Sequence, residues 1–214
     1  MGLENDLREK LCATGKNLVK EGLVRGKEGN ISARIPKTDK VIIKPSKFAM
    51  GELSPEDLII VDLDEKIVEG SHKPSKETPM HTTIYKHRAD VGAVFHTHPI
   101  YSTCLGVMGK PIIPLSFAGF RAVLKGVPIV PYHHPGSLDL ARAIVRSLGS
   151  DKSAVLLKYH GLVIVEKDVE SALELSIGVE KAARIQFLCS LLGKPKPMRR
   201  KSIEEFLKGL VERE

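Results

Sequence analysis

The chain contains no tryptophan, and only 5% of its 214 residues are aromatic. A folded core must therefore be filled mainly by aliphatic side chains, which the 42% hydrophobic content can supply. The sequence also lacks any run of the roughly 18 apolar residues that a membrane-spanning helix requires. We therefore expect no membrane partner, and the length favours a single domain.

Cysteine is scarce: Cys12, Cys104 and Cys189 are odd in number, widely spaced and without a C-x-x-C pair. This excludes a disulfide framework and favours a reducing compartment. The first ten residues are polar and charged, unlike a secretory signal. We therefore expect a cytoplasmic protein, with Cys104 buried rather than acting as a nucleophile.

Charge of one sign predominates, with a formal net charge of +7 and a pI near 9.3. The basic residues are scattered, except for a cluster in a proline-containing stretch: Lys194, Lys196, Arg199, Arg200 and Lys201. We interpret that stretch as a solvated linker, so nucleic acid is not an expected partner. A basic surface suits a small anionic substrate through long-range attraction.

Helical and strand patterns alternate along the chain. We expect helices over residues 3–23, 77–88, 99–107, 138–148, 169–192 and 203–211, and strands over 31–35, 41–43, 58–63, 67–68, 91–95, 112–113, 127–130, 154–157 and 162–165. Several consecutive strands are joined by short turns, which favours antiparallel pairing. The predicted fold is a single α/β domain with a mixed, mainly antiparallel central sheet flanked by helices on both faces.

Two histidines, His96 and His98, follow a predicted buried strand and are two residues apart. Side chains at this spacing share one face of a strand, so two neutral imidazoles can point at one ion. His160 lies between two later predicted strands, and Glu77 lies upstream at the start of a helix. Three imidazoles and a carboxylate predict a divalent-metal site. The alternative is that the histidine pair faces solvent at a strand end.

Five motifs carry a family resemblance: Gly29-Asn30-Ile31-Ser32, Lys44-Pro45-Ser46, the stretch 73–81, His96-Thr97-His98-Pro99 and His160-Gly161. In order and spacing they resemble the class II aldolase/adducin family, of the L-fuculose-1-phosphate aldolase type. The resemblance spans residues 29–161, and the flanking helices fit the same fold. It implies a catalytic domain over residues 1–193, followed by a basic linker and short helix over 194–214.

The resemblance implies that His96, His98 and His160 are zinc ligands and that Glu77 handles the proton. Mn²⁺, Co²⁺ or Fe²⁺ could also bind three histidines. The implied reaction cleaves a ketose 1-phosphate, such as L-fuculose 1-phosphate, to dihydroxyacetone phosphate and a small aldehyde such as lactaldehyde. Three neutral histidines leave zinc an open position, where it can stabilise an enediolate as a Lewis acid. Burial would raise the pKa of Glu77 and a cation would lower it, so the sequence leaves its direction open.

The resemblance also implies a phosphate pocket formed by Asn30, Ser46, Ser75 and their neighbours. We expect Ser75 to cap the helix that begins near Glu77 and to leave backbone N–H groups free for an anion. The alternative is ordinary turn chemistry. Lys47 and Lys76 replace the glycine and serine usual in the family, and both add positive charge near the expected phosphate pocket. The sequence leaves open whether their side chains point into the pocket or away from it.

Another departure concerns a second acid/base. Related aldolases often use a tyrosine from a neighbouring subunit, but residues 112–120 contain Phe117 and no tyrosine, and none follows Tyr159. Tyr132, His133 and His134 are candidate replacements, although the two histidines are typical of a surface turn. We expect Tyr159 to be a core or wall residue.

Two alternative functions remain open: a sugar-phosphate epimerase or dehydratase on the same metal site, and a non-catalytic adducin-like interaction module, which the intact ligand set disfavours. The resemblance further implies a homotetramer with its sites near subunit boundaries. The broadly apolar helix expected over residues 169–192 is consistent with such association.

Overall fold

The structure is a computed structural model that describes residues 2–117 and 123–211. Its helices are α1 (Leu3–Lys20), α2 (Thr78–His87), α3 (Ile100–Val107), α5 (Leu138–Leu148), α6 (Val169–Leu192) and α7 (Arg200–Val211), with short 3₁₀ turns η1 (Met50–Glu52) and η2 (Pro55–Asp57). Its strands are β1 (Asn30–Arg34), β2 (Lys40–Ile43), β3 (Ile59–Asp62), β4 (Ile67–Glu69), β5 (Ala93–Thr97), β6 (Ile129–Val130), β7 (Ala154–Leu157) and β8 (Leu162–Glu166).

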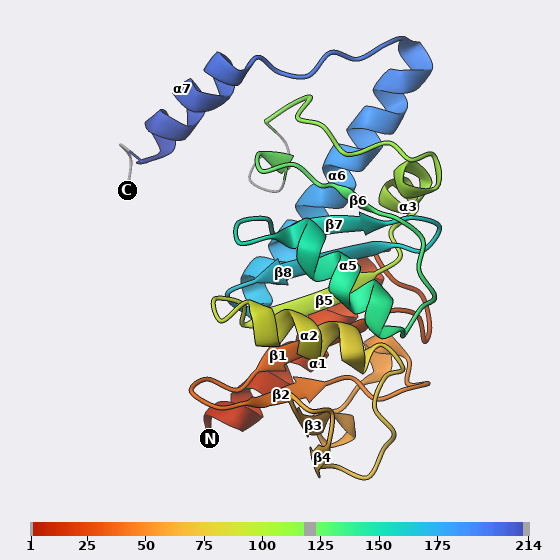
Figure 1. Ribbon diagram of the computed structural model, residues 1–214, viewed down its shortest axis with the longest axis vertical. Coiled ribbons are helices and arrows are strands. Elements are labelled where there is room, and N and C mark those ends of the chain that lie inside the picture. The colour runs from red at the N-terminus through yellow and green to blue at the C-terminus, as the bar shows by residue number, and fades with distance from the viewer. Residues whose placement is uncertain (1, 118–122, 212–214) are drawn as a thin grey trace.

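The eight strands form one sheet in the order β4-β3-β2-β1-β5-β8-β7-β6 (Figure 1). Every neighbouring pair is antiparallel except β6 and β7, which are parallel. This confirms the mixed, mainly antiparallel sheet. The strand expected over 112–113 is reduced to an isolated bridge between Ile112 and Val127, and the neighbouring strand shortens to β6.

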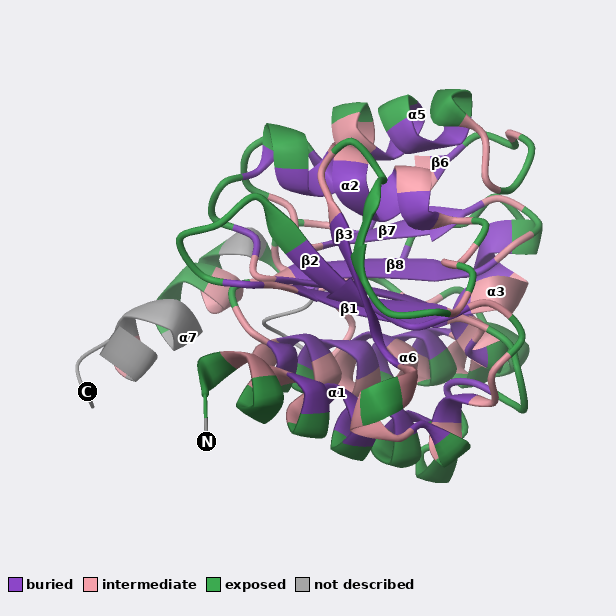
Figure 2. Ribbon diagram, turned by 90° about the horizontal axis from the view of Figure 1, so that it is seen from below, coloured by how far each residue is buried: buried purple, intermediate pink, exposed green. Residues whose placement is uncertain are grey.

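Helices cover both faces of the sheet, as expected: α2 and α5 lie on one face, and α1 and α6 on the other (Figure 2). The strands alternate accordingly, because successive side chains point to opposite faces. On β2, Ile42 packs toward α1 and α6 while Val41 and Ile43 pack toward α2 and α5. Two hydrophobic clusters therefore sandwich the sheet.

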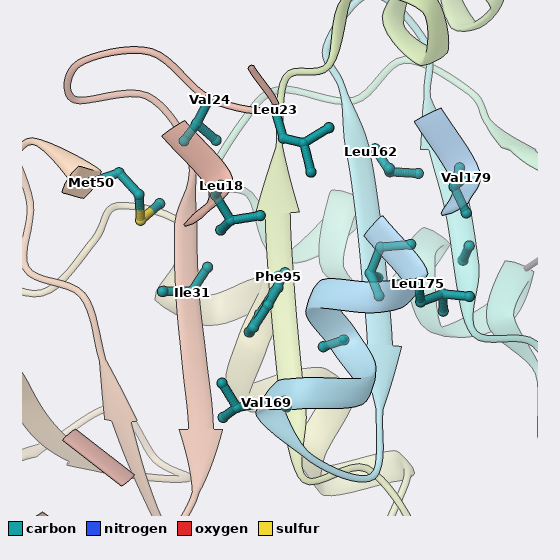
Figure 3. Packing of buried hydrophobic residues seen from close by; sticks show 14 of the residues in the cluster. Leu18, Leu23, Val24, Ile31, Met50, Phe95, Leu162, Val169, Leu175 and Val179 are labelled. Carbon is teal, nitrogen blue, oxygen red and sulfur yellow. The ribbon is translucent and has the colours of Figure 1, made fainter. Parts of the chain in front are cut away.

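The cluster beneath α1 and α6 lies next to the loops that follow β5 and precede β1. Figure 3 shows Ile31 and Phe95 on adjacent strands with Leu18 from α1 close to Ile31, and Leu175 from α6 belongs to the same cluster. Phe95 is fully buried and stands directly before His96. Burial of such side chains contributes roughly 1.5–3 kcal/mol each, so the strand that carries the histidines is firmly held.

Polar groups on neighbouring residues fix several helix starts. Ser137 Oγ accepts a hydrogen bond from the Leu140 N–H at the start of α5, and the Asp168 carboxylate accepts from the Ser171 N–H at the start of α6. α3 has no such local cap. Instead, Glu180 of α6 accepts hydrogen bonds from the backbone N–H groups of Tyr101 and Ser102 at distances of 2.8 and 2.9 Å.

The C-terminal segment leaves the sheet domain. After α6 the chain runs along one end of the molecule, where the Met198 N–H donates to the Pro114 carbonyl at 2.8 Å, and α7 projects away from the sheet (Figure 1). Among the described helices, none combines the length and the apolarity that a bilayer span needs.

Candidate metal centre

The three predicted histidines converge at one end of β5 and β8. His96 lies on β5 opposite Val163 of β8, His98 follows β5, and His160 lies in the tight turn between β7 and β8. The Nε2 atom of His96 lies 2.9 Å from that of His98 and 3.2 Å from that of His160. One ring nitrogen from each histidine lies within 4.8 Å of the others. Residues 64 positions apart in the sequence thus share one site.

The β7–β8 turn presses directly against these histidines. A Cβ atom at Gly161 would lie 2.4 Å from the Thr97 carbonyl oxygen and 2.7 Å from Cδ2 of His98. Only glycine fits so close to another backbone. Tyr159, at the start of the same turn, adopts a left-handed conformation with φ of 61°. The turn that carries His160 is therefore shaped around the site.

His96 and His160 are held as neutral imidazoles. His96 Nδ1 lies 3.0 Å from the Leu162 carbonyl oxygen, which requires an N–H there and leaves the Nε2 lone pair facing the other rings. Burial lowers the pKa of His96 to about 3, and it also lowers the pKa of His160. Nitrogen lone pairs this close repel unless a cation lies among them. The donor set therefore fits a divalent metal ion.

Glu77 lies beside the histidines. Its Oε2 atom is 3.3 Å from Nε2 of His96, and its Oε1 atom is 3.7 Å from Nε2 of His160. Burial by itself raises the pKa of Glu77, but the neighbouring His96 and the hydrogen bond from Asn30 outweigh it, so the pKa falls below its usual value. Glu77 is therefore ionised at neutral pH, which is the state that a proton acceptor needs. Oε1 is buried and has no hydrogen-bond partner among residues 2–117 and 123–211.

The loops that carry the expected phosphate-binding residues lie side by side. An isolated bridge joins Pro45 to Pro74, and the Ser46 N–H donates to the Lys73 carbonyl at 2.9 Å. Lys47 and Lys76 are exposed. Lys47 has a φ of 69°, the left-handed conformation that glycine adopts without cost. This conformation gives a physical reason for the glycine usual at that position.

Two residues of this set differ from expectation. Ser75 does not cap α2: Glu77 occupies the capping position, and Ser75 Oγ instead accepts from the Glu77 N–H at 3.2 Å, because Ser75 lies too far before the helix. Asn30 is not in a turn but begins β1 and is buried. Its Nδ2 donates to Oε2 of Glu77 at 2.8 Å, and its place in the phosphate pocket stays a prediction.

The candidates for a second acid/base are peripheral. Phe117 is exposed, and residues 118–120 of the same region lie outside the described residues. Tyr132 and Tyr159 are also exposed, with ring centroids 6.4 Å apart. Tyr159 is therefore not in the core, and its alternative place in the wall of the metal pocket stays a prediction. His133 is half-buried, and His134 Nδ1 hydrogen-bonds the carbonyl of its neighbour Pro135, as expected of a surface turn.

A cavity of about 550 Å³ opens beside His98 and His160. One wall carries the charged side chains of Arg25 and Glu28. The other comes from α3 and is mainly apolar: Ile100, Thr103, Cys104, Val107 and Met108. Cys104 is half-buried in this wall rather than fully buried. The site therefore includes a cavity that can hold a small molecule, with one charged wall and one apolar wall.

Sequence reasoning assigned no role to a buried polar group behind Glu77. His81, fully buried on α2, contacts Oδ1 of Asn30 through Nε2 and Oγ of Ser32 through Nδ1, the latter at 2.6 Å. Ser32 Oγ in turn lies 2.9 Å from the hydroxyl of Tyr85. The available signal was the spacing, because His81 follows Glu77 by four residues and shares its helix face.

Comparisons with known proteins agree with this geometry. The family model described as the class II aldolase and adducin N-terminal domain matches residues 9–187. The chain is 33% identical over 205 residues to the 5-deoxy-D-ribulose 1-phosphate aldolase of Bacillus thuringiensis serovar kurstaki, covering 94% of this chain and 93% of the relative. It is 32% identical over 185 residues to the L-fuculose phosphate aldolase of Methanocaldococcus jannaschii, covering 86% and 96%. A solved L-fuculose 1-phosphate aldolase superposes with a TM-score of 0.89 at 28% identity, covering 96% of each chain.

Proposed function

The chain belongs to the class II aldolase and adducin family, and on that basis we propose that it is a divalent-metal-dependent aldolase. It cleaves a ketose 1-phosphate to dihydroxyacetone phosphate and a small aldehyde. The observation that carries this proposal is the meeting of three imidazoles with Oε1 of Glu77, which accepts no hydrogen bond from the described residues. His96, His98 and His160 would hold the metal, for which zinc is our first choice.

When bound, the cation supplies Lewis-acid stabilisation of the negative charge that develops on the substrate's carbonyl and hydroxyl oxygens. The protein's own contribution is proton transfer. On cleavage, the hydroxyl that becomes the aldehyde loses its proton, and the neighbouring carbon of the dihydroxyacetone phosphate half gains one. Glu77 starts as the carboxylate, takes up the proton that the hydroxyl loses and delivers a proton to this carbon; in the reverse direction it removes a proton from the hydroxymethyl carbon and returns one to the aldehyde oxygen.

The remaining candidates hold the other end of the substrate. Ser46 and Ser75, with the exposed Lys47 and Lys76, form a polar and positively charged edge beside Glu77 that suits the phosphate. The Asn30 side chain, which hydrogen-bonds Glu77, would also act on the carboxylate. The phosphate and the proton-transfer group would therefore approach the substrate from the same side.

The cavity narrows the choice of aldehyde. Its α3 wall, formed in part by Ile100, Val107 and Met108, suits an apolar end group better than a hydroxyl. Both relatives are named for deoxy sugars, whose aldehyde products end in a methyl group. We therefore favour L-fuculose 1-phosphate or 5-deoxyribulose 1-phosphate over fully hydroxylated ketose phosphates.

The decisive assay incubates metal-replete protein with each of these two substrates and measures dihydroxyacetone phosphate and aldehyde together. Equal amounts of both products are expected. A His98→Ala variant should lose bound metal and cleavage together, whereas His87→Ala, which alters an exposed histidine at the end of α2, should keep both. Retention of metal and activity by His98→Ala would contradict the proposal.

A second candidate keeps the metal site and changes the reaction. Phe117, in place of the tyrosine usual in aldolases of this type, favours an epimerase or a dehydratase. Product masses from the same incubation separate the cases, because cleavage gives two fragments, dehydration loses one water and epimerisation leaves the mass unchanged. A non-catalytic module would bind no stoichiometric divalent metal, so metal analysis tests it directly.

We also propose a homotetramer located in the cytoplasm. The end of α6 leaves Leu188, Leu191 and Leu192 exposed, which gives the chain an apolar surface that another subunit could cover. Cys12, Cys104 and Cys189 are free thiols, which is consistent with a reducing compartment.

A further inference from the structure

A line of buried hydrogen bonds runs from the central sheet to Glu77. We propose that Tyr85, Ser32 and His81 form a one-directional relay that fixes the Asn30 amide, so that Oε2 of Glu77 is held and Oε1 transfers the proton. The inference rests on the proposed aldolase function only in assigning Oε1 its task. His81 is then a positioning residue that acts on Glu77 through Asn30.

The relay links two elements that lie on either side of the interface between α2 and the sheet. Asn30 and Ser32 are alternate residues of β1, so both side chains point toward α2. His81 and Tyr85 are four residues apart on α2 and share the face that meets them. Ser32, His81 and Tyr85 are each at most 1% exposed, so water cannot replace their partners.

The polarity of the relay is fixed from its Glu77 end. At the sheet end, the Tyr85 hydroxyl lies 2.9 Å from Ser32 Oγ, and either hydroxyl can donate. Burial raises the pKa of Tyr85, so the phenol keeps a proton that it can give to Ser32 Oγ. At the other end, Asn30 presents its NH₂ group to Glu77, because Nδ2 donates to Oε2 at 2.8 Å.

The polarity at Glu77 determines the direction of the remaining hydrogen bonds. With its NH₂ on Glu77, Asn30 turns Oδ1 toward His81, and this oxygen requires a donor at Nε2. Ser32, which receives the phenol proton, donates its own to Nδ1. His81 must therefore be neutral with its proton on Nε2. Burial lowers the pKa of His81 to about 4, which is consistent with a neutral ring.

The consequence for Glu77 is a difference between its two oxygens. Oε2 is bonded to Asn30 at 2.8 Å, while Oε1 has no hydrogen-bond partner in the described part of the chain and lies on the side of His160. A carboxylate held by one oxygen presents the other in a fixed direction. If His81 carried its proton on Nδ1, its Nε2 lone pair would oppose Oδ1 of Asn30. The amide would then tend to flip and turn its oxygen against Glu77.

The first test needs no catalysis. Histidine-selective ¹⁵N-labelled wild-type protein is examined by long-range ¹H–¹⁵N correlation at pH 7, with His81 assigned by comparison with a His81→Gln variant. The relay requires a neutral ring protonated on Nε2. A proton on Nδ1, or a charged ring, would overturn the proposal whatever reaction the enzyme performs.

The second test measures the proton transfer alone. Solvent deuterium exchange into the hydroxymethyl group of dihydroxyacetone phosphate is followed by NMR, without any aldehyde, for wild type and variants with equal metal content. His81→Leu should slow exchange by about 10- to 100-fold with little change in KM, by analogy with other supporting-residue losses. His81→Gln, whose amide offers both a donor and an acceptor, should recover much of the rate.

Graded variants keep the test sound if His81→Leu folds poorly. Ser32→Ala removes the hydroxyl that donates to Nδ1 of His81. It should slow deuterium exchange more than Tyr85→Phe, which removes only the hydroxyl that contacts Ser32. His87→Gln, at an exposed position on the same helix, should exchange at the wild-type rate. Wild-type exchange together with full activity in Ser32→Ala and His81→Leu would refute the relay. Absence of exchange in metal-replete wild type would instead refute the aldolase function.

Discussion

Gly161 shows how one residue without a side chain can define a metal centre. Its backbone lies against the Thr97 carbonyl and the His98 ring, so an added Cβ would force the β7–β8 turn away from β5. The His160 side chain moves with that turn. The distance between His96 and His160 thus depends on the residue after His160 as much as on the histidines themselves.

We expect Gly161→Ala to weaken metal binding by about 10- to 100-fold and to lower the free energy of unfolding by about 1–3 kcal/mol. Competition with a chelator and urea denaturation measure the two effects. Gly209→Ala in α7 is the matched control, because nothing lies within 4 Å of its added Cβ. Unchanged metal affinity in Gly161→Ala would contradict the close packing.

Lys44 is a second residue with a large effect of its own, because it is a buried cation. Its side chain is only 2% exposed, and among the described residues its Nζ atom donates only to the carbonyl of its neighbour Pro45, at 3.4 Å. Burial lowers the pKa of Lys44 from 10.5 to about 8. Below pH 8 both folded and unfolded chains are protonated at this residue, so the full cost of burying the charge is present at neutral pH.

Between pH 8 and pH 10.5 the unfolded chain binds the Lys44 proton and the folded chain does not, so this residue makes stability rise with pH. We expect Lys44→Met to raise the free energy of unfolding at pH 7 by about 1–3 kcal/mol. The gain should shrink at pH 10. Urea denaturation of both proteins at the two pH values checks this, and an equal gain at both would contradict the charged state inferred for Lys44.

At the scale of elements, the site depends on how α3 is anchored. This helix begins two residues after His98, and it forms the apolar wall of the cavity. Its first N–H groups are bound by Glu180 from α6, so two helices distant in sequence are joined at the mouth of the site. A substitution in α6 that removes these hydrogen bonds should therefore alter the position of His98.

Glu180→Ala should lower the free energy of unfolding by about 1–2 kcal/mol, as expected for the loss of a helix cap. Amide hydrogen exchange at Tyr101 and Ser102 should accelerate at the same time. Glu180→Gln keeps one acceptor oxygen and should show a smaller effect on both. Exchange rates at these two amides that do not change in Glu180→Ala would show that the cap does not hold α3.

At the scale of the whole molecule, the chain divides into the sheet domain and a projecting C-terminal segment (Figure 1). The segment over 194–214 contains the basic cluster and α7. The two hydrophobic clusters that enclose the sheet draw no residue from the described part of this segment. The stability of the domain should therefore be independent of it.

A chain truncated after Gly193 should keep a single cooperative urea transition, with a free energy of unfolding within about 1 kcal/mol of the full chain, because it loses no core residue. Light scattering on both proteins then tests assembly, and the full chain should show four times the 23.5 kDa of one subunit. Loss of the cooperative transition would place residues 194–214 within the domain. A mass of one subunit would contradict the tetramer.

The sequence by itself predicted the alternation of elements, the mainly antiparallel sheet and the two-sided helix cover, because hydrophobic period and short turns are local properties. It also predicted that His96, His98 and His160 meet, because strand spacing and motif order were enough for that. Two turns show the limit of local patterns: Lys47 has a left-handed backbone conformation, and Glu77 rather than Ser75 occupies the capping position of α2. Turn conformation depends on neighbours that the pattern does not name.

Only the tertiary structure decided the direction of the Glu77 pKa, the partners of Asn30 and the role of His81. Each depends on contacts between β1 and α2, which lie about 50 residues apart in the chain. Burial and hydrogen bonding oppose each other at Glu77, and their balance depends on distances that no motif contains. The sequence therefore determined which groups are present at the centre, and the packing of α2 on the sheet decided which of their atoms are free to react.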